Sequence, residues 1–376
     1  MATSAPPRLW TLDALRGACA GVVFLSHWHL WSGFAPQGAI ETAVRRAFDG
    51  IYEVFVIGTW PLGGHHPAVL GFFVLSGFCI HFPFEWRLRQ GGGAPSWREY
   101  FRRRFLRIMP VYWGACLLGF AFVALEWARP GGLPLLTLHA AAPAAHVAVR
   151  LAGVSGVYPD EIFAGNYLLN TVAVEMLMYA AYPLVHRFAA RGAWRALGAV
   201  FLGLHLAAIA LLPWVTPFWV FNSVLMLGLF WYAGALAAHL HVTRGWTVRG
   251  RSVGLAWAAF LGVKLIPHFY GLNLVKQAAW VVVCALGLVW ALRRETDRAD
   301  VSHRPLIRAL RWTGRVSYSL YAVHTPAIML ATWALLVFAG CRDYFWQLAA
   351  TLAASIGATL AMHYGVERRF YRPRDA

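Results

Sequence analysis

The sequence predicts an all-α protein that crosses a membrane about ten times. Of its 376 residues, 59% are hydrophobic and only 13% are charged, whereas about 25% are charged in a soluble domain. The apolar residues are grouped in runs that approach the length of a membrane-spanning helix. The basic residues, nearly all of them arginine, lie in the segments between these runs. The chain lacks the polar surface that a soluble protein of this length needs, so lipid is its expected solvent.

Ten membrane-spanning segments are expected, with ends defined to within several residues. They run near 12–31, 67–83, 108–127, 167–185, 195–213, 218–238, 252–267, 273–292, 315–338 and 346–365. Several are short or contain Gly or Pro, which is tolerated where the backbone is buried in protein. The two longest connections, 32–66 and 128–166, have neither the length nor the composition of a separate domain. We therefore expect a single transmembrane domain over 10–371, between short cytoplasmic tails at 1–9 and 372–376.

The basic residues predict that both termini are cytoplasmic. With the N-terminus inside, the inner segments hold 24 basic residues and the outer segments seven, and arginine marks the cytoplasmic side of short loops. This topology explains the formal net charge of +17, so no nucleic-acid partner is expected. No cleavable signal peptide is apparent, and the first span is expected to be retained. The five scattered cysteines predict neither a disulfide framework nor a metal site.

The first span carries Arg16 and His27, eleven residues apart in an otherwise apolar stretch. On a helix this spacing places both side chains on one face, about 16 Å apart. An arginine at the centre of a membrane helix costs about 2.5–3.5 kcal/mol on insertion scales. A pair on one face therefore indicates a site, although an arginine that reaches the headgroups and a histidine bonded to a neighbouring helix would explain each residue singly.

The second and third spans add a serine and a basic cluster. Ser76 lies in GFFVLSGF at 71–78. Its Ser-Gly pair permits either close helix approach or a local break in the helix, and a nucleophilic role is disfavoured because no G-x-S-x-G motif surrounds it. Arg103, Arg104 and Arg107 lie at the cytoplasmic entry to the third span. They are explained either by topology alone or by a phosphate site for a nucleotide-bearing donor, since arginine forms bidentate phosphate contacts.

The fourth and ninth spans contain further ionisable residues. Glu175 is the carboxylate within the fourth span, with Tyr179 one turn later on the same face. An intramembrane glutamate indicates function and needs a partner; the alternative is a structural pair with an arginine or a tyrosine. Tyr321 and His324 lie three residues apart in the ninth span. His324 either lines the same cavity as the other candidate residues or is a packed core histidine.

Taken together and in this order, these motifs resemble the acyltransferase-3 family of integral-membrane acyltransferases over nearly the whole chain, about residues 10–371. LDALRG…H places the family's R-x10-H motif on Arg16 and His27. The other matching segments are FFVLSGF at 72–78, RRFLRIMP at 103–110, TVAVEMLMY at 171–179 and GRVSYSLYAVH at 314–324. The chain departs from the family pattern at four positions, which bear on the acceptor more than on the reaction type: Leu70, Asn170, Met176 and Met178.

The resemblance implies an enzyme that takes an acyl group, usually acetyl, from cytoplasmic acyl-CoA and delivers it to a hydroxyl, often of an exported carbohydrate. The family's histidine is regarded as the catalytic base, which carries over to His27, and its arginine, here Arg16, is associated with acyl-CoA. The implied location is a bacterial-type inner (plasma) membrane, with lipid and a carbohydrate or glycolipid acceptor as partners.

We therefore expect a multi-pass O-acyltransferase without a metal or a permanently bound cofactor, using acyl-CoA as co-substrate. His27 is the expected base, and Glu175 is expected to orient a histidine or to bind the acceptor. The expected acyl-CoA contacts are Arg16, Arg103, Arg104 and Arg107. The candidate cavity-lining residues are Ser76, Tyr179, Tyr321 and His324. The alternatives are a transporter or flippase for a polar or lipid-linked solute, whose pathway would use the same intramembrane residues, and a structural membrane subunit.

Overall fold

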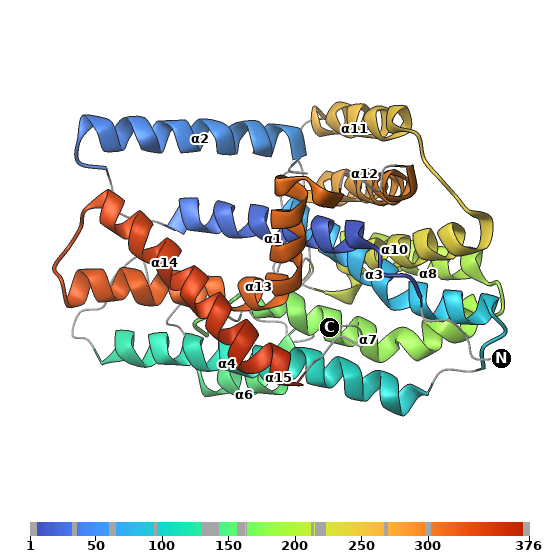
Figure 1. Ribbon diagram of the computed structural model, residues 1–376, viewed down its shortest axis with the longest axis horizontal. Coiled ribbons are helices and arrows are strands. Elements are labelled where there is room, and N and C mark those ends of the chain that lie inside the picture. Colours follow the sequence, from blue (N-terminus) through green and yellow to red (C-terminus); the bar gives the residue numbers. More distant parts are fainter. Residues whose placement is uncertain are drawn as a thin grey trace. The chain divides into compact units, whose positions relative to one another are not determined.

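The computed structural model describes most of the chain as helices (Figure 1). The described residues are 6–31, 36–59, 65–93, 96–128, 143–155, 162, 164–211, 214, 223–266, 270–297 and 302–370. The helices are α1 (Trp10–Trp31), α2 (Ala39–Thr59), α3 (Pro67–Arg89), α4 (Trp97–Trp127), α6 (Ala144–Ala152), α7 (Leu169–Ala189), α8 (Trp194–Leu211), α10 (Val224–Arg244), α11 (Gly250–Lys264), α12 (Tyr270–Asp297), α13 (Pro305–Val337), α14 (Tyr344–Met362), η3 (His363–Glu367) and α15 (Arg368–Phe370). Within these residues there is no strand, so the all-α prediction is confirmed.

Each of the ten expected spans overlaps a helix in the described residues. Within the described residues, seven segments are long and apolar enough to cross a membrane by length and composition: α3, α4, α8, α10, Val275–Glu295 of α12, α13 and Tyr344–Phe370. The other three expected spans, which are α1, α7 and α11, are not among these seven. The chain is therefore a polytopic helical protein, as expected, while the cytoplasmic placement of both termini stays a prediction.

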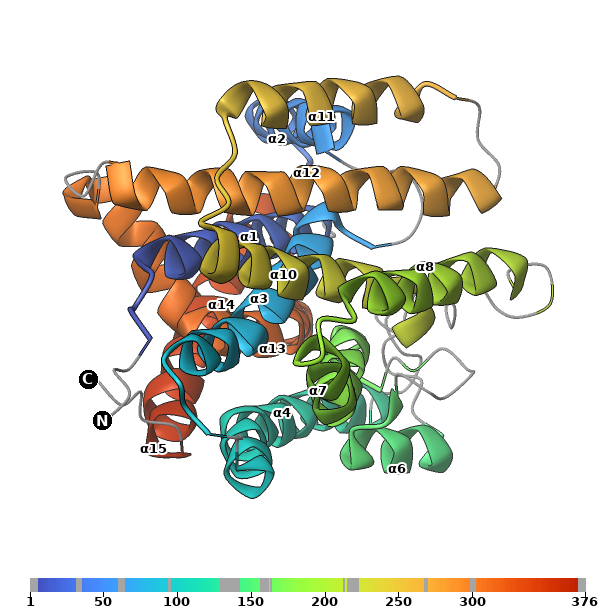
Figure 2. The ribbon, with the colours of Figure 1, turned by 90° about the vertical axis from the view of Figure 1, so that its right-hand side faces the viewer.

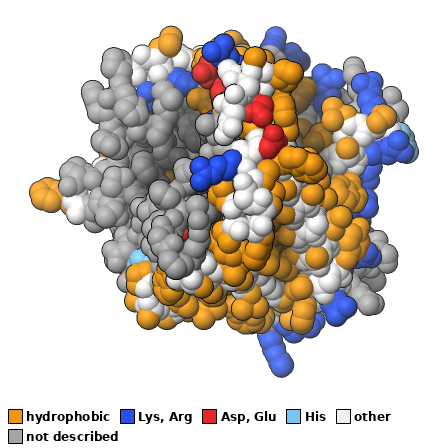
Figure 3. Space-filling model, turned by 90° about the vertical axis from the view of Figure 1, so that its left-hand side faces the viewer, with side chains coloured by type: hydrophobic (Ala, Val, Ile, Leu, Met, Phe, Trp, Pro, Cys, Tyr) orange, Lys and Arg blue, Asp and Glu red, His pale blue; other side chains and the backbone are white. Residues whose placement is uncertain are grey.

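The surface of the described helices is rich in apolar side chains, as a lipid environment requires. Figure 3 shows one face on which hydrophobic side chains cover much of the described surface. Large apolar residues in the spans are well exposed, among them Leu117, Leu206 and Trp346, which are 66%, 54% and 67% exposed. Soluble monomers seldom expose contiguous apolar surface on this scale.

Two helices lie where the sequence predicted only long connections. Helix α2 falls within 32–66 and α6 within 128–166. None of the residues of α2 is buried, and its apolar residues Ile51 and Val54 are 70% and 71% exposed. Its Arg45 Nε lies 3.1 Å from Asp49 Oδ1, one turn along. That i, i+4 spacing of opposite charges is the signal in the sequence that favours a helix here.

The chain forms two compact units, each built from three separate segments. One comprises Met1–Cys19, Thr59–Phe101 and Val174–Arg315 and is called unit 1; the other comprises Ala20–Gly58, Arg102–Ala173 and Val316–Ala376 and is called unit 2. The boundaries between the units fall inside α1, α4, α7 and α13 and before the last residue of α2. Neither unit is a continuous stretch of sequence, so no composition shift marks it.

Glycines bring the helices of unit 1 into backbone contact. Helices α3 and α10 lie side by side (Figure 2). A Cβ added to Gly77 would lie 1.9 Å from Trp231 O, and one on Gly234 would lie 1.8 Å from Val74 O. The same holds where α1 meets α13, because a Cβ on Gly314 would lie 1.8 Å from Asp13 O. Small residues at helix crossings allow this approach, so the glycine of the 72–78 segment has the packing role that its sequence predicted.

Unit 2 is held together by an apolar cluster and by a buried arginine. The cluster comprises Phe122, Val123, Ile162, Ala164, Met329 and Trp333. Arg150 of α6 is fully buried and donates from Nη2 to Ile162 O at 2.7 Å, while Tyr112 Oη donates to Arg150 O at 2.8 Å. Arg150 therefore links α4 to the segment before α7. In the sequence it was only one of the seven basic residues assigned to the outer segments.

Candidate functional site

His27 lies in unit 2 at one end of a buried histidine pair. Its Nδ1 is 2.9 Å from Nε2 of His324 on α13, and the two rings stack with centroids 5.2 Å apart and an interplanar angle of 13°. Tyr167, just before α7, places its hydroxyl 3.2 Å from His27 Nε2. His324 Nδ1 lies 2.8 Å from the backbone oxygen of Leu320. Both histidines are buried, so the pair is shielded from bulk solvent.

The hydrogen bonds assign a proton position to each ring nitrogen of neutral imidazoles. A backbone carbonyl can only accept, so His324 Nδ1 carries the hydrogen that bonds to Leu320 O. His324 Nε2 is then an acceptor, and His27 Nδ1–H must donate to it. His27 Nε2 is left with a lone pair, which accepts from the Tyr167 hydroxyl. The chain of bonds thus presents His27 Nε2 as the basic nitrogen of the site.

Neighbouring side chains hold these elements in place. Asn166 Nδ2 donates to Ala322 O at 2.7 Å, between the segment before α7 and α13. The Thr171 and Tyr321 hydroxyls are 2.6 Å apart across α7 and α13. Next to His27, the Trp28 indole N–H contacts α14 at Thr351 Oγ1, 3.1 Å away. These bonds join α1, the segment before α7, α7, α13 and α14 around the histidine pair.

Glu175 lies in unit 1 and has hydroxyl partners. Ser76 Oγ donates to Glu175 Oε1 at 2.7 Å, and the Tyr179 hydroxyl donates to the same oxygen. Ser76 Oγ and Tyr179 Oη are 3.2 Å apart. The partner that the sequence required for this carboxylate is thus a pair of hydroxyls from α3 and α7. Ser76 uses its hydroxyl hydrogen on Glu175, and the expectation that it is no covalent nucleophile stays a prediction.

The predicted arginines divide between the two units. Arg16 belongs to unit 1, where its guanidinium lies 3.8 Å from Asp13 Oδ1 and its side chain is 21% exposed. Arg103, Arg104 and Arg107 lie near the start of α4 in unit 2, and all three are half-buried. Arg103 and Arg107 are one turn apart on the same helix face. The unbroken helix α1 carries both Arg16 and His27, so the spacing of the R-x10-H motif is helical throughout.

The candidate residues therefore form two groups, and the sequence missed one member. Tyr321 and His324 lie with His27 in unit 2, whereas Ser76 and Tyr179 lie with Glu175 in unit 1. Tyr167 was missed because the sequence placed it at the start of a membrane span, where its ring counts as apolar. A tyrosine hydroxyl at the edge of a span, in GNYLLN, is the signal that could have found it.

The fold and the site define a polytopic helical membrane protein with a buried, hydrogen-bonded histidine pair. The family model described as "Acyltransferase domain" matches residues 9–364, which is nearly the whole chain. This chain belongs to the acyltransferase-3 family and is a membrane acyltransferase, as the five sequence motifs predicted. Neither the curated proteins nor the solved structures contain a significant match to it.

Proposed function

We propose that this acyltransferase moves an acyl group, acetyl in the first instance, from cytoplasmic acyl-CoA to a hydroxyl of a carbohydrate or glycolipid, with His27 as the general base. The observation that carries this proposal is the chain of hydrogen bonds from His27 through His324 to Leu320 O, which leaves the lone pair on His27 Nε2. The bonds measure 2.9 Å from His27 Nδ1 to His324 Nε2 and 2.8 Å from His324 Nδ1 to Leu320 O. An imidazole whose second nitrogen is held by a hydrogen bond is the usual form of a catalytic base.

In the proposed step, an acceptor hydroxyl takes the place of the Tyr167 hydroxyl at His27 Nε2. The nitrogen removes the proton while the acceptor oxygen attacks the thioester carbonyl. The carbon–sulfur bond then breaks, and the thiolate of coenzyme A leaves and takes the proton from the imidazolium. The ester product and free thiol balance the reaction, and His27 returns to its neutral form. No further reactant is required.

The proposed donor contacts are the arginines of the motifs. Coenzyme A carries a diphosphate and a further phosphate, and Arg103, Arg104 and Arg107 supply planar donors that suit them. Arg103 and Arg107 share a helix face, which supports a joint contact. Arg16 is also proposed to contact acyl-CoA. The support is the R-x10-H motif, which places Arg16 on the same helix as His27.

Glu175 is proposed to bind the acceptor rather than to orient a histidine. The support is its set of partners, because Ser76 Oγ and Tyr179 Oη both donate to Glu175 Oε1. A carboxylate flanked by two hydroxyls is the kind of group that recognises a sugar hydroxyl.

Membranes supplied with labelled acetyl-CoA test the role of His27. We expect His27→Gln to lower label transfer about 10²–10⁴-fold, the contribution of a positioned general base. The control is His205→Gln, since His205 is also buried but bonds to Met226 O on α10. A His27→Gln protein that is inserted, folded and fully active would refute the mechanism.

The donor contacts have a separate readout in the same assay. Arg107→Gln should raise the KM for acetyl-CoA with little change in kcat, because phosphate contacts are made equally in the ground and transition states. A transporter would show neither acetyl-CoA-dependent label transfer nor protection from heat unfolding by acetyl-CoA.

A further inference from the structure

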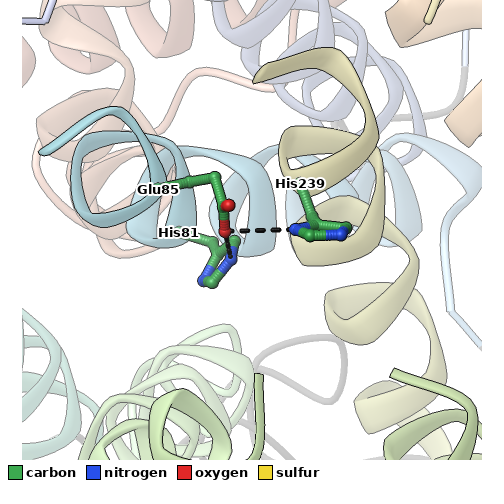
Figure 4. Close-up of side chains that lie close together, drawn as sticks. All are labelled: His81, Glu85 and His239. Atoms are coloured by element: carbon green, nitrogen blue, oxygen red, sulfur yellow. Dashed lines mark hydrogen bonds and ion pairs between the residues drawn. The ribbon is translucent and has the colours of Figure 1, made fainter. Parts of the chain in front are cut away.

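Three side chains with metal-binding atoms meet between α3 and α10 in unit 1 (Figure 4). Glu85 Oε2 lies 2.9 Å from His81 Nε2 and 3.2 Å from His239 Nδ1. All three ligand atoms lie within 4.8 Å of one another. In the part of the chain that the structure describes, no other group of three His, Cys, Asp or Glu residues comes together in this way. The cluster takes no part in the proposed acyl transfer.

The backbone holds the three residues at a fixed separation. His81 and Glu85 are one turn apart on α3 and share a face. His239 comes from α10, which is locked against α3 by the contacts of Gly77 and Gly234, where an added Cβ would lie 1.9 Å and 1.8 Å from the facing carbonyl oxygens. Helices in backbone contact cannot slide without breaking that packing. The ligand set is therefore built in advance rather than gathered from mobile surface side chains.

The donor set suits a divalent transition metal. Two imidazole nitrogens and one carboxylate oxygen are ligands that Zn²⁺ and Fe²⁺ accept, and three protein ligands leave a further position for water. With metal–ligand bonds of about 2.0–2.1 Å, tetrahedral geometry puts neighbouring ligand atoms about 3.3 Å apart. The separations of 2.9 and 3.2 Å from Glu85 Oε2 are close to that value, and the two imidazole nitrogens lie within 4.8 Å of each other.

The surroundings supply the outer contacts that metal-bound histidines use. His81 Nδ1 lies 3.0 Å from the buried Tyr182 hydroxyl, and a ligating imidazole normally bonds through its other nitrogen. The Trp194 ring stacks on His239 with centroids 4.6 Å apart and meets His81 edge-on at 5.0 Å. Both imidazoles are thus held in orientation. The His239 side chain is 20% exposed, against 1% for His81, which gives an ion a route of entry.

Charge also favours an ion at this position. Glu85 is 11% exposed at the side chain, and its two neighbours, His81 and His239, are positive only when they are protonated. A buried carboxylate needs a positive partner, because desolvation of an isolated charge is costly. A divalent cation satisfies the carboxylate and leaves both imidazoles neutral, which is the form that binds metal.

We propose that His81, Glu85 and His239 bind a divalent transition metal, with Zn²⁺ as the first candidate, and that the ion clamps α3 to α10. Sequence alone could not reveal the site, because the third ligand lies far along the chain from the other two. The site adds a structural ion to a protein whose acyl-transfer chemistry uses none of these three residues.

The test uses the full chain in detergent, purified through a tag without histidine and stripped with a chelator. Calorimetric titration with Zn²⁺ should give one site per chain, and Co²⁺ should give the visible absorption of a four-coordinate site. Glu85→Gln and His239→Ala should each weaken Zn²⁺ binding at least 100-fold, because each loses a direct ligand. The matched control is His241→Ala, on the same helix, where His241 packs on Phe78 and Phe82.

Thermal unfolding gives a second readout. Zn²⁺ should raise the Tm of the wild-type and His241→Ala proteins and leave the Tm of Glu85→Gln unchanged, since an ion that binds only the folded state stabilises it. Glu85→Gln keeps the size and polarity of the side chain, so it tests the site even if His239→Ala fails to fold. Equal Zn²⁺ affinity in wild-type and Glu85→Gln proteins, or no bound Zn²⁺ at all, would overturn the proposal and leave a hydrogen-bonded cluster. Acyl transfer is not measured, so this outcome is independent of the role of His27.

Discussion

His324 is the residue whose substitution most directly tests how the histidine pair works. Its Nε2 accepts from His27 Nδ1–H at 2.9 Å, and its own Nδ1–H donates to Leu320 O at 2.8 Å. His324→Leu removes the acceptor, so the buried His27 Nδ1–H loses its partner and the ring is free to change tautomer. His324→Gln places an amide oxygen where it can accept the same hydrogen. We therefore assign His324 to positioning the base, and expect the two variants to differ.

The magnitude follows from the lost hydrogen bond. Leaving a buried donor without a partner costs about 1–3 kcal/mol, and each 1.36 kcal/mol of barrier is about tenfold in rate. His324→Leu should therefore lower kcat about 5- to 150-fold, and His324→Gln by clearly less. The KM for acyl-CoA should stay near the wild-type value in both, because no proposed phosphate contact is altered.

The assay is the initial rate of acetyl transfer against acetyl-CoA concentration, measured over a range of pH. If His27 is no longer held in one tautomer, the shape of the pH profile of kcat should also change. A purely structural defect would lower kcat without changing the shape of that profile. Circular dichroism and size-exclusion chromatography in detergent establish that each variant is folded. A His324→Leu enzyme with wild-type kcat, or one altered only in KM, would show that the bond between the histidines has no catalytic role.

Two predictions concern stability, each measured as thermal unfolding in detergent. Gly234→Ala should lower the Tm, because the added Cβ would lie 1.8 Å from Val74 O. Gly21→Ala should keep or raise the Tm, because no atom lies within 4 Å of its added Cβ. Equal effects of the two variants would contradict backbone contact between α3 and α10. Burial lowers the pKa of His66 to about 3, and its neutral Nδ1 accepts from Ala68 N at the start of α3. The unfolded chain takes up this proton near pH 6.5 and the folded chain only near pH 3, so stability is present above about pH 6.5 and falls by up to about 1.4 kcal/mol per pH unit below it. His66→Asn keeps the cap and cannot titrate, so an unchanged acid dependence in that variant would rule out this account.

The polytopic membrane class and the shared helix face of Arg16 and His27 could be predicted from the sequence, because both depend on local periodicity. The long apolar runs specify membrane helices one at a time, and a spacing of eleven residues places Arg16 and His27 on one face of a helix whatever packs against it. The need of Glu175 for a partner was likewise predictable, since an intramembrane carboxylate cannot be left unpaired. Tyr179, one turn along the same helix, was among the partners that the sequence offered, whereas Ser76 on the facing helix was not.

Only the tertiary structure decided which side chains meet. His27 bonds to His324 nearly three hundred residues later, and Glu85 meets His239 across a helix crossing. Such pairs depend on which helices approach closely, and here that is set by glycines such as Gly234, whose effect cannot be inferred without knowing the facing helix. Helix α2 was missed for a different reason, because charged residues interrupt its apolar residues and leave no long apolar run to mark it. By itself, the sequence determined the helices and the chemistry they carry; the packing decided the tautomer of the base and assembled the ligand cluster.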